Sequence, residues 1–167
     1  MKAVLISIRP EWCDMIMSGI KTLEVRKTKP KIEVPFKCYI YCTQPKTKDP
    51  WKTLELHTQE KAYRCNGKVV AEFTCDHISQ VAFMYYDGLV DVVDCDTSCL
   101  SAKEILDYAG GQIPLYGWHI SKLKVYEKPK ELSAIKGLKK CKFGWAPYEL
   151  TRAPQSWQYV EGLETNG

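Results

Sequence analysis

Apolar and polar residues alternate along several stretches of this chain, which is the pattern of a half-buried β-strand. The apolar residues at positions 4, 6 and 8 are interleaved with Leu5, Ser7 and Arg9, and this predicts a first strand. Similar patterns predict further strands over 21–27, 36–42, 68–75, 116–126 and 156–162. We expect the strand at 68–75 to extend to 81 and the strand at 116–126 to stop near Pro129. The chain is therefore expected to contain about six strands.

Short helices with recognisable start and stop signals are expected between these strands. Pro10 suits the first position of a helix, where its missing N–H costs nothing, and Gly19 suits a left-handed cap that ends it. Further along, Ser101 and Glu104 have the spacing of a capping box. They predict a helix that runs through Tyr108 and ends at the following glycine pair.

The remaining segments lack a clear period. Asp49-Pro50 favours a helix start and Asn66-Gly67 a turn. The lysine-rich segment 130–153 is expected to be irregular, and 163–167 a frayed tail. Together these elements predict a single α+β domain over 1–167, in which a small mixed β-barrel or curled sheet is flanked by short helices.

Composition agrees with one globular domain. The chain has 167 residues, of which 45% are hydrophobic and 26% charged. No apolar run approaches the roughly 20 residues needed to cross a membrane. The brief apolar stretch at the N-terminus runs straight into a periodic pattern, unlike a cleaved signal peptide. We therefore expect a cytoplasmic protein without a membrane partner; the oligomeric state stays open.

Eight cysteines are a high count for this length, but their spacing lacks the CxxC pairs of zinc fingers. Cys38 and Cys42 fall in one predicted strand, about 13 Å apart, so they cannot share a metal ion. Cys95 and Cys99 could meet on a helical turn but have no second ligand pair. We expect thiols in a reducing cytosol, several of them buried, and no metal or cofactor.

Charge is distributed unevenly along the chain. The net charge is +4 overall, with +5 over residues 1–50, −5 over 51–113 and +4 over 114–167. We expect the acidic stretch at about 85–113 to be a variable helical insertion. If both ends of the chain fold onto one face, that face is basic and suits an anionic partner. Solvated lysines without a partner remain the alternative.

The most informative stretch is GIKTLEVR at residues 19–26. In a strand, Glu24 and Arg26 share one face about 7 Å apart, and Lys21 lies at the entrance. Ser7 and Arg9 project from the first strand and are expected to line the same cavity. One carboxylate among several cations suits a nucleotide, which offers both amino donors and an anionic phosphate. The alternative is an ion pair that only fixes the strand register.

Aromatic residues supply a second candidate feature, because unpaired bases stack on such rings. Trp118 is included as a candidate ligand contact, although a core position competes with this role, as it does for Trp12 and Trp157. Tyr39 and Tyr41 share a strand face with Lys37 and Thr43, and this face is expected to be partly wet. His119 has no spacing typical of a metal site or a nucleophilic triad.

Gly19, Lys21, Glu24 and Arg26 match GxKxxExR, the signature of the ASCH domain in the PUA-like superfamily. A strand and a short helix precede the motif, as in that family. GWHIS at 117–121 and the later residues Thr151, Arg152, Pro154, Ser156, Trp157, Tyr159 and Val160 resemble a group of small bacterial and phage members. The resemblance covers nearly the whole chain and implies a small β-barrel flanked by helices.

The resemblance implies RNA or modified-nucleotide binding in a charged cleft. The expected ligand contacts are Lys21, Glu24, Arg26, Ser7, Arg9 and Trp118. A similar branch hydrolyses acetylated cytidine with the motif lysine, and another cleaves RNA without metal. This gives the alternative of a metal-independent hydrolase with Lys21 as base, in which Glu24 would also act. However, Glu24 stands where the amidohydrolase branch has a threonine. A mobile-element accessory protein that binds a protein or metabolite is the third hypothesis.

Overall fold

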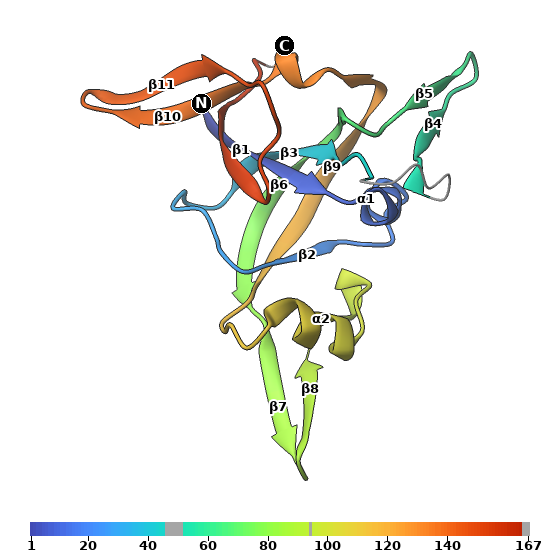
Figure 1. Ribbon diagram of the computed structural model, residues 1–167, viewed down its shortest axis with the longest axis vertical. Coiled ribbons are helices and arrows are strands. Elements are labelled where there is room, and N and C mark those ends of the chain that lie inside the picture. Colours follow the sequence, from blue (N-terminus) through green and yellow to red (C-terminus); the bar gives the residue numbers. More distant parts are fainter. Residues whose placement is uncertain (46–51, 94, 165–167) are drawn as a thin grey trace.

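The computed structural model describes residues 1–45, 52–93 and 95–164. Strands dominate the fold, and two α-helices and short 3-10 turns lie around them (Figure 1). The strands are β1 (Lys2–Ile8), β2 (Leu23–Arg26), β3 (Phe36–Cys42), β4 (Glu55–His57), β5 (Ala62–Arg64), β6 (Lys68–Gln80), β7 (Ala82–Tyr86), β8 (Leu89–Val93), β9 (Tyr116–Lys130), β10 (Lys136–Cys141), β11 (Gly144–Glu149) and β12 (Trp157–Glu161). The helices are α1 (Pro10–Met17) and α2 (Ala102–Ala109), with 3-10 turns η2 (Asp96–Ser98) and η3 (Leu132–Ala134).

Eight strands form one open mixed sheet in the order β11-β10-β12-β1-β3-β6-β9-β2. The β1–β3 pair is parallel and the other neighbours are antiparallel. The expected closed barrel is therefore not confirmed. Its edge strands, β11 in a protruding hairpin and the four-residue β2, do not pair with each other. The mixed, strand-dominated α+β class is confirmed.

Local signals in the sequence placed many elements correctly. The strand over 36–42 is confirmed as predicted, and β6 extends to Gln80. Ser101 and Glu104 form the predicted capping box, and Gly110 ends α2 in the left-handed conformation. The segment 130–153 is not irregular, because it contains β10 and β11, and Pro129 does not stop β9. Asp49-Pro50 and residues 165–167 of the expected tail lie outside the described residues.

The apolar core lies on both faces of the central strands. Along β1, Val4, Ile6 and Ile8 belong to a cluster that includes residues of α1, whereas Ala3 and Leu5 belong to a second cluster on the opposite face. Such two-sided burial explains why β1 reads as an almost continuous apolar run. Ser7 is its one buried polar side chain, which marks a position where β1 meets something other than the core.

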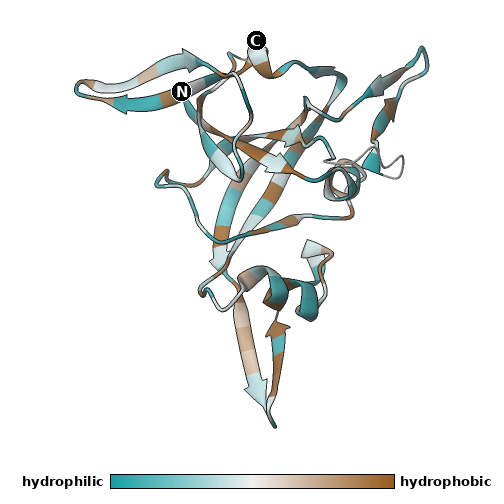
Figure 2. Ribbon diagram, in the orientation of Figure 1, coloured by the Kyte–Doolittle hydropathy of each residue, from teal (hydrophilic) through white to brown (hydrophobic). Residues whose placement is uncertain are grey.

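The acidic segment contains more than a helix. It forms the β7–β8 hairpin, then η2 and α2, and the hairpin projects away from the main sheet with several apolar residues exposed (Figure 2). A third apolar cluster packs Ile105 of α2 against Leu23 and Val25 of β2. Part of the segment therefore covers the motif strand. No helix in the described part of the chain is long and apolar enough to span a membrane.

Candidate functional site

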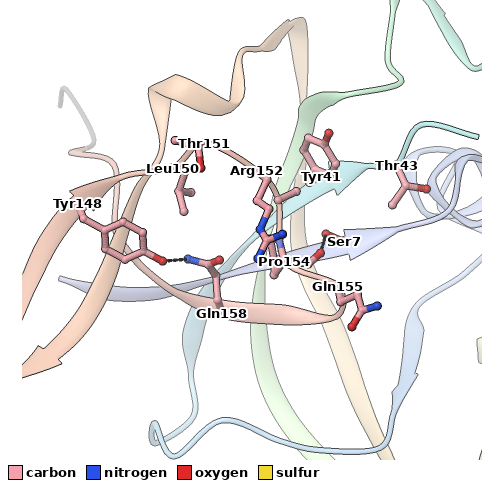
Figure 3. A pocket seen from close by; sticks show the side chains of 11 residues that line it. Ser7, Tyr41, Thr43, Tyr148, Leu150, Thr151, Arg152, Pro154, Gln155 and Gln158 are labelled. Carbon is pink, nitrogen blue, oxygen red and sulfur yellow. Dashed lines mark hydrogen bonds between the residues drawn. The ribbon is translucent and has the colours of Figure 1, made fainter.

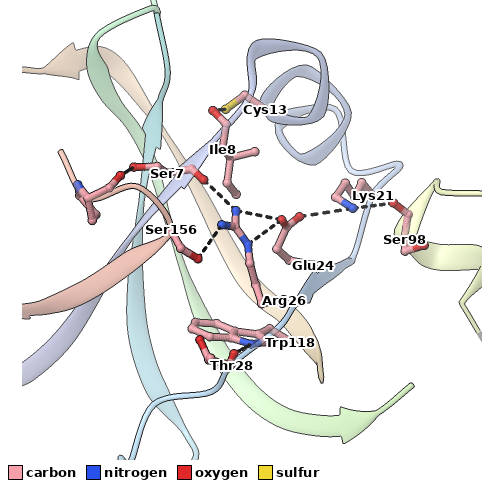
Figure 4. A network of polar contacts seen from close by, with 11 residues as sticks. Ser7, Ile8, Cys13, Lys21, Glu24, Arg26, Thr28, Ser98, Trp118 and Ser156 are labelled. Carbon is pink, nitrogen blue, oxygen red and sulfur yellow. Dashed lines mark hydrogen bonds and ion pairs between the residues drawn. The ribbon is translucent and has the colours of Figure 1, made fainter. Parts of the chain in front are cut away.

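The charged side chains of the motif form a buried network (Figure 4). Lys21 is 1% exposed, Glu24 7% and Arg26 8%. Glu24 lies between the two cations: its Oε1 accepts a hydrogen bond from Arg26 Nε at 3.0 Å, and its Oε2 is 3.3 Å from Lys21 Nζ. The network carries one negative and two positive formal charges, so Glu24 is the only carboxylate in it that balances the cations.

The backbone explains how these residues meet. Gly19 has a φ of +81°, which lets the chain turn back after α1, and Lys21 N–H then donates to Met15 O at 3.0 Å. The following strand pairs with β9 so that Glu24 lies opposite Trp118. Because strand side chains alternate, Leu23 faces the third apolar cluster while Glu24 and Arg26 face the charged network.

Lys21 is enclosed by segments far apart in the sequence. Its Nζ donates to the carbonyl oxygen of Ser98 in η2 at 2.5 Å and lies 5.4 Å from the centre of the Trp12 ring. A peptide oxygen, a carboxylate and an aromatic face thus surround the ammonium group. In this arrangement Lys21 fastens the acidic segment to the motif strand.

Arg26 connects the motif to the chain before β12. Its Nη2 donates to Ser7 O at 2.7 Å, and its Nη1 donates to Ser156 Oγ at 3.2 Å. Ser7 reinforces this connection, because its Oγ donates to Pro154 O at 2.6 Å and its N–H donates to Ser156 O at 2.9 Å. The guanidinium fork and Ser7 together hold residues 151–156, which we call the 151–156 loop.

The 151–156 loop forms one wall of a surface cavity of about 820 Å³ (Figure 3). Most of the residues that line the cavity are polar or aromatic, and the cavity volume lies within the usual range for small-molecule sites. The lining residues are Ser7, Tyr41, Thr43, Tyr148, Leu150, Thr151, Arg152, Ala153, Pro154, Gln155 and Gln158. Gln158 donates to Tyr148 Oη at 2.9 Å, which fixes the phenol at one end of the cavity. Arg152 brings the only formal charge among the lining residues.

The structure places the predicted site residues in four different settings. Lys21, Glu24 and Arg26 meet one another, as the spacing predicted, but they lie behind Ser7 and do not line the cavity; Ser7 does. Arg9 is exposed at the start of α1 and contributes its backbone oxygen to that helix.

Trp118 lies in the core. It is 0% exposed, packs edge-on against Phe36 and Trp157, and its Nε1 donates to Thr28 O at 3.3 Å. In this structure its position is that of a core residue, the alternative role considered for it.

Sequence reasoning did not select Tyr148, Arg152, Gln155 or Gln158 as site residues. A signal for Arg152 existed, because it belongs to the family-like ending that begins at Thr151. The partly wet strand face expected at Lys37, Tyr39, Tyr41 and Thr43 is a second signal, since Tyr41 and Thr43 line the cavity. The expectation is wrong for Tyr39, which is 0% exposed. Burial raises the pKa of Tyr41, with a smaller contribution from Cys42, so its phenol stays a hydrogen-bond donor at neutral pH.

A second polar cluster lies on β3, β6 and β9, away from the cavity lining. Glu72 accepts hydrogen bonds from Lys37 Nζ at 2.7 Å and Tyr126 Oη at 2.6 Å. Burial by itself would raise the pKa of Glu72, but these two hydrogen bonds and the charges of Lys37 and Lys124 together outweigh it, and the pKa is lowered. Within the described ranges, no three His, Cys, Asp or Glu side chains come together as a metal site would require.

His119 forms a surface pair. Its Nδ1 lies 2.6 Å from Asp76 Oδ1, and both side chains are nearly half exposed. The hydrogen bond to His119 lowers the pKa of Asp76. The pair is outside the cavity lining and outside the motif network.

Comparison with known proteins identifies the fold and the family. The crystal structure of ASCH from Zymomonas mobilis superimposes with a TM-score of 0.55 at 18% identity, covering 95% of this chain and 87% of that chain. A tyrosine-to-phenylalanine mutant of the same protein gives a TM-score of 0.54 at 18% identity, with coverages of 96% and 91%. Comparison with curated protein sequences gives no significant match. The model of the ASCH domain matches residues 6–140, and the chain therefore belongs to the ASCH domain family.

Proposed function

We propose that this protein binds RNA or a modified nucleotide in the cavity beside the 151–156 loop. One observation carries the proposal: the family motif, through Arg26, is hydrogen-bonded to the elements that wall a nucleotide-sized polar cavity. Buried ion networks are costly unless their geometry is well satisfied. Here the buried network of the motif holds one loop in place. We infer that the position of this loop matters for binding.

The cavity offers each kind of contact that a nucleotide needs. Arg152 would meet a phosphate, since a guanidinium pairs with phosphate through two parallel hydrogen bonds. Tyr148 would offer a ring for stacking, and Gln155 an amide for a base edge. Lys21, Glu24 and Arg26 act as positioning residues in this proposal, behind the wall rather than against the ligand.

The hydrolase alternative is less well supported by the geometry. A general base must come within hydrogen-bond reach of its substrate. Lys21 is 1% exposed, donates to Ser98 O, and is not among the residues that line the cavity beside the 151–156 loop. Incubation with acetylated cytidine, followed by chromatography, separates the two functions, because turnover that is lost in Lys21→Met would favour the enzyme.

We further place the protein in the cytoplasm. Several cysteines, among them Cys13, Cys38 and Cys42, are buried thiols in the core. Such usage is typical of a reducing compartment.

Binding is tested by fluorescence anisotropy with labelled oligouridylates of 3 and 12 nucleotides and by competition with free nucleotides. Arg152→Ala should weaken binding of the trinucleotide about tenfold or more, since hydrogen bonds to charged groups contribute about 1.5–3 kcal/mol. Arg64→Ala is the matched control, because Arg64 is an exposed arginine on the separate β4–β5 ribbon. Absence of binding at low salt, or equal affinities of both variants, would refute the proposed function.

A further inference from the structure

The β10–β11 hairpin is a basic and aromatic projection from the edge of the main sheet (Figure 1). Residues 136–149 contain four lysines and one glutamate, a net charge of +3. The single acid, Glu149, is already paired with Lys136 at 3.7 Å. Phe143 at the tip is 92% exposed and Trp145 is 43% exposed. A ring as exposed as that of Phe143 contributes little to the core, so its presence at the tip calls for another explanation.

Strand register assigns the hairpin side chains to two faces. The opposed pairs Gly137–Tyr148, Lys139–Ala146 and Cys141–Gly144 place these six residues on one face, the face of Tyr148. Apart from Tyr148 and Lys139, this face carries only small side chains. It therefore forms a shallow strip of about 20 Å, the length of six strand residues, between Tyr148 and the tip.

Tyr148 joins this strip to the cavity. Its ring lies directly against Gly137, where an added Cβ would come within 2.4 Å of the ring. The phenol end of the ring thus lies over Gly137 of β10, and its hydroxyl accepts a hydrogen bond from Gln158 of the cavity lining. Lys139 Nζ lies 6.0 Å above the same ring. A base that stacks on Tyr148 would therefore have a cation beside it and an open strip ahead of it.

The tip repeats the combination of ring and cation. Lys142 Nζ lies 5.7 Å from the centre of the Phe143 ring. Lysines that alternate with exposed rings are typical of surfaces that bind single-stranded nucleic acid without reading sequence. A protein partner suits this surface less well, because interface cores are depleted in lysine.

We propose that the strip from Tyr148 to Phe143 binds the continuation of a single-stranded RNA whose end nucleotide occupies the cavity. Bases would stack on Tyr148 and Phe143, and phosphates would meet Lys139 and Lys142. The proposal rests on the proposed function, because the cavity supplies the anchored nucleotide. It adds a partner class, an extended single strand rather than a free nucleotide.

Affinity as a function of RNA length tests the strip separately from the cavity. The measured quantity is the ratio of the Kd for the 3-nucleotide oligouridylate to the Kd for the 12-nucleotide one. Phe143→Ala should lower this ratio about fivefold or more, since stacking of one base contributes about 1–3 kcal/mol. Lys139→Ala with Lys142→Ala should lower it and reduce the slope of log Kd against log salt by about 1.4, or about 0.7 for each phosphate that is no longer neutralised.

Matched variants elsewhere control for nonspecific effects. Tyr85→Ala removes an aromatic ring that is 71% exposed on the β7–β8 hairpin. Lys124→Ala with Lys128→Ala removes two exposed lysines from β9. Both should leave the ratio unchanged. Gly137→Ala keeps every lysine and ring but displaces Tyr148, which belongs to both the cavity and the strip, so it should weaken binding of both RNAs.

The outcomes are distinguishable. If the 3-nucleotide RNA binds through Arg152 but the ratio is the same in the hairpin variants and in wild type, the strip proposal is wrong and the cavity proposal stands. If the control lysine pair lowers the ratio as much as the hairpin pair, the effect is general charge and the strip proposal is also wrong. If neither RNA binds, the proposed function itself is refuted. A surface that serves a protein partner would give the first of these results.

Discussion

Removal of the charge on Glu24 should destabilise the protein more than removal of the charge on Lys21. Glu24→Gln keeps the shape of the side chain and one oxygen for Arg26 Nε. It nevertheless leaves two buried cations, Lys21 and Arg26, without their shared carboxylate. Lys21→Met removes the ammonium group instead and leaves a balanced pair of Glu24 and Arg26.

The magnitudes follow from burial. Loss of one partner from a buried ion pair costs about 3–5 kcal/mol, because the remaining charge stays desolvated. We expect a cost in this range for Glu24→Gln, since its side chain is only 10% exposed and bonded at 3.0 Å. Lys21→Met leaves the Ser98 carbonyl without its donor, a loss of about 1–3 kcal/mol. The double variant should cost less than the sum of the two.

Urea unfolding followed by tryptophan fluorescence measures these free energies by linear extrapolation. Equal slopes of free energy against urea would show that the variants unfold from comparable native states. A cost below about 1 kcal/mol for Glu24→Gln would contradict the assignment of Glu24 as the balancing charge. So would a Lys21→Met variant that is less stable than Glu24→Gln.

Three further predictions concern pH and thiols. The pKa of Glu72 is lowered in the folded state, so the stability that its carboxylate contributes is present above the ordinary pKa of 4.5 and is lost as pH falls through the folded pKa. Glu72→Gln should therefore flatten the acid limb of the curve of stability against pH. An acid limb that is unchanged in this variant would contradict the stabilising role of Glu72. Burial raises the pKa of Cys75 from 9.0 to about 12, so the free energy of unfolding should fall as pH rises through this interval. The fall should be less steep in Cys75→Ala, and urea unfolding at several pH values measures it. Iodoacetamide should label Cys141 first and Cys99 more slowly in the native protein, because the other six cysteines are buried; mass spectrometry showing more than two native adducts would contradict this.

The sequence predicted the local features of the site well, because they depend on neighbouring residues. A period of two was enough to place Glu24 and Arg26 on one face. An ion pair between these two side chains was one of the two interpretations of the motif. The glycine after α1 and the capping box of α2 were also readable, since cap chemistry acts within a few residues.

The sequence did not reveal the long-range partners of the motif. Lys21 donates to Ser98, 77 residues away, and Arg26 to Ser156, 130 residues away. No periodicity encodes such pairings, so the cavity wall could not be placed against the motif in advance. The hairpin at 136–149 was missed for another reason: it projects from the sheet, so neither face needs the apolar alternation that reveals a half-buried strand.

The central position of β1 has a consequence for the order of folding. Its residues pair with β3 on one side and with β12 on the other, so that Lys2 lies opposite Glu161. A nascent chain therefore exposes one edge of β1 until β12 has been synthesised. Contacts of such long sequence separation are typical of chains that fold in milliseconds to seconds rather than microseconds. Arg26 acquires its Ser156 partner only when β12 has paired with β1, so the position of the 151–156 loop is fixed late in folding.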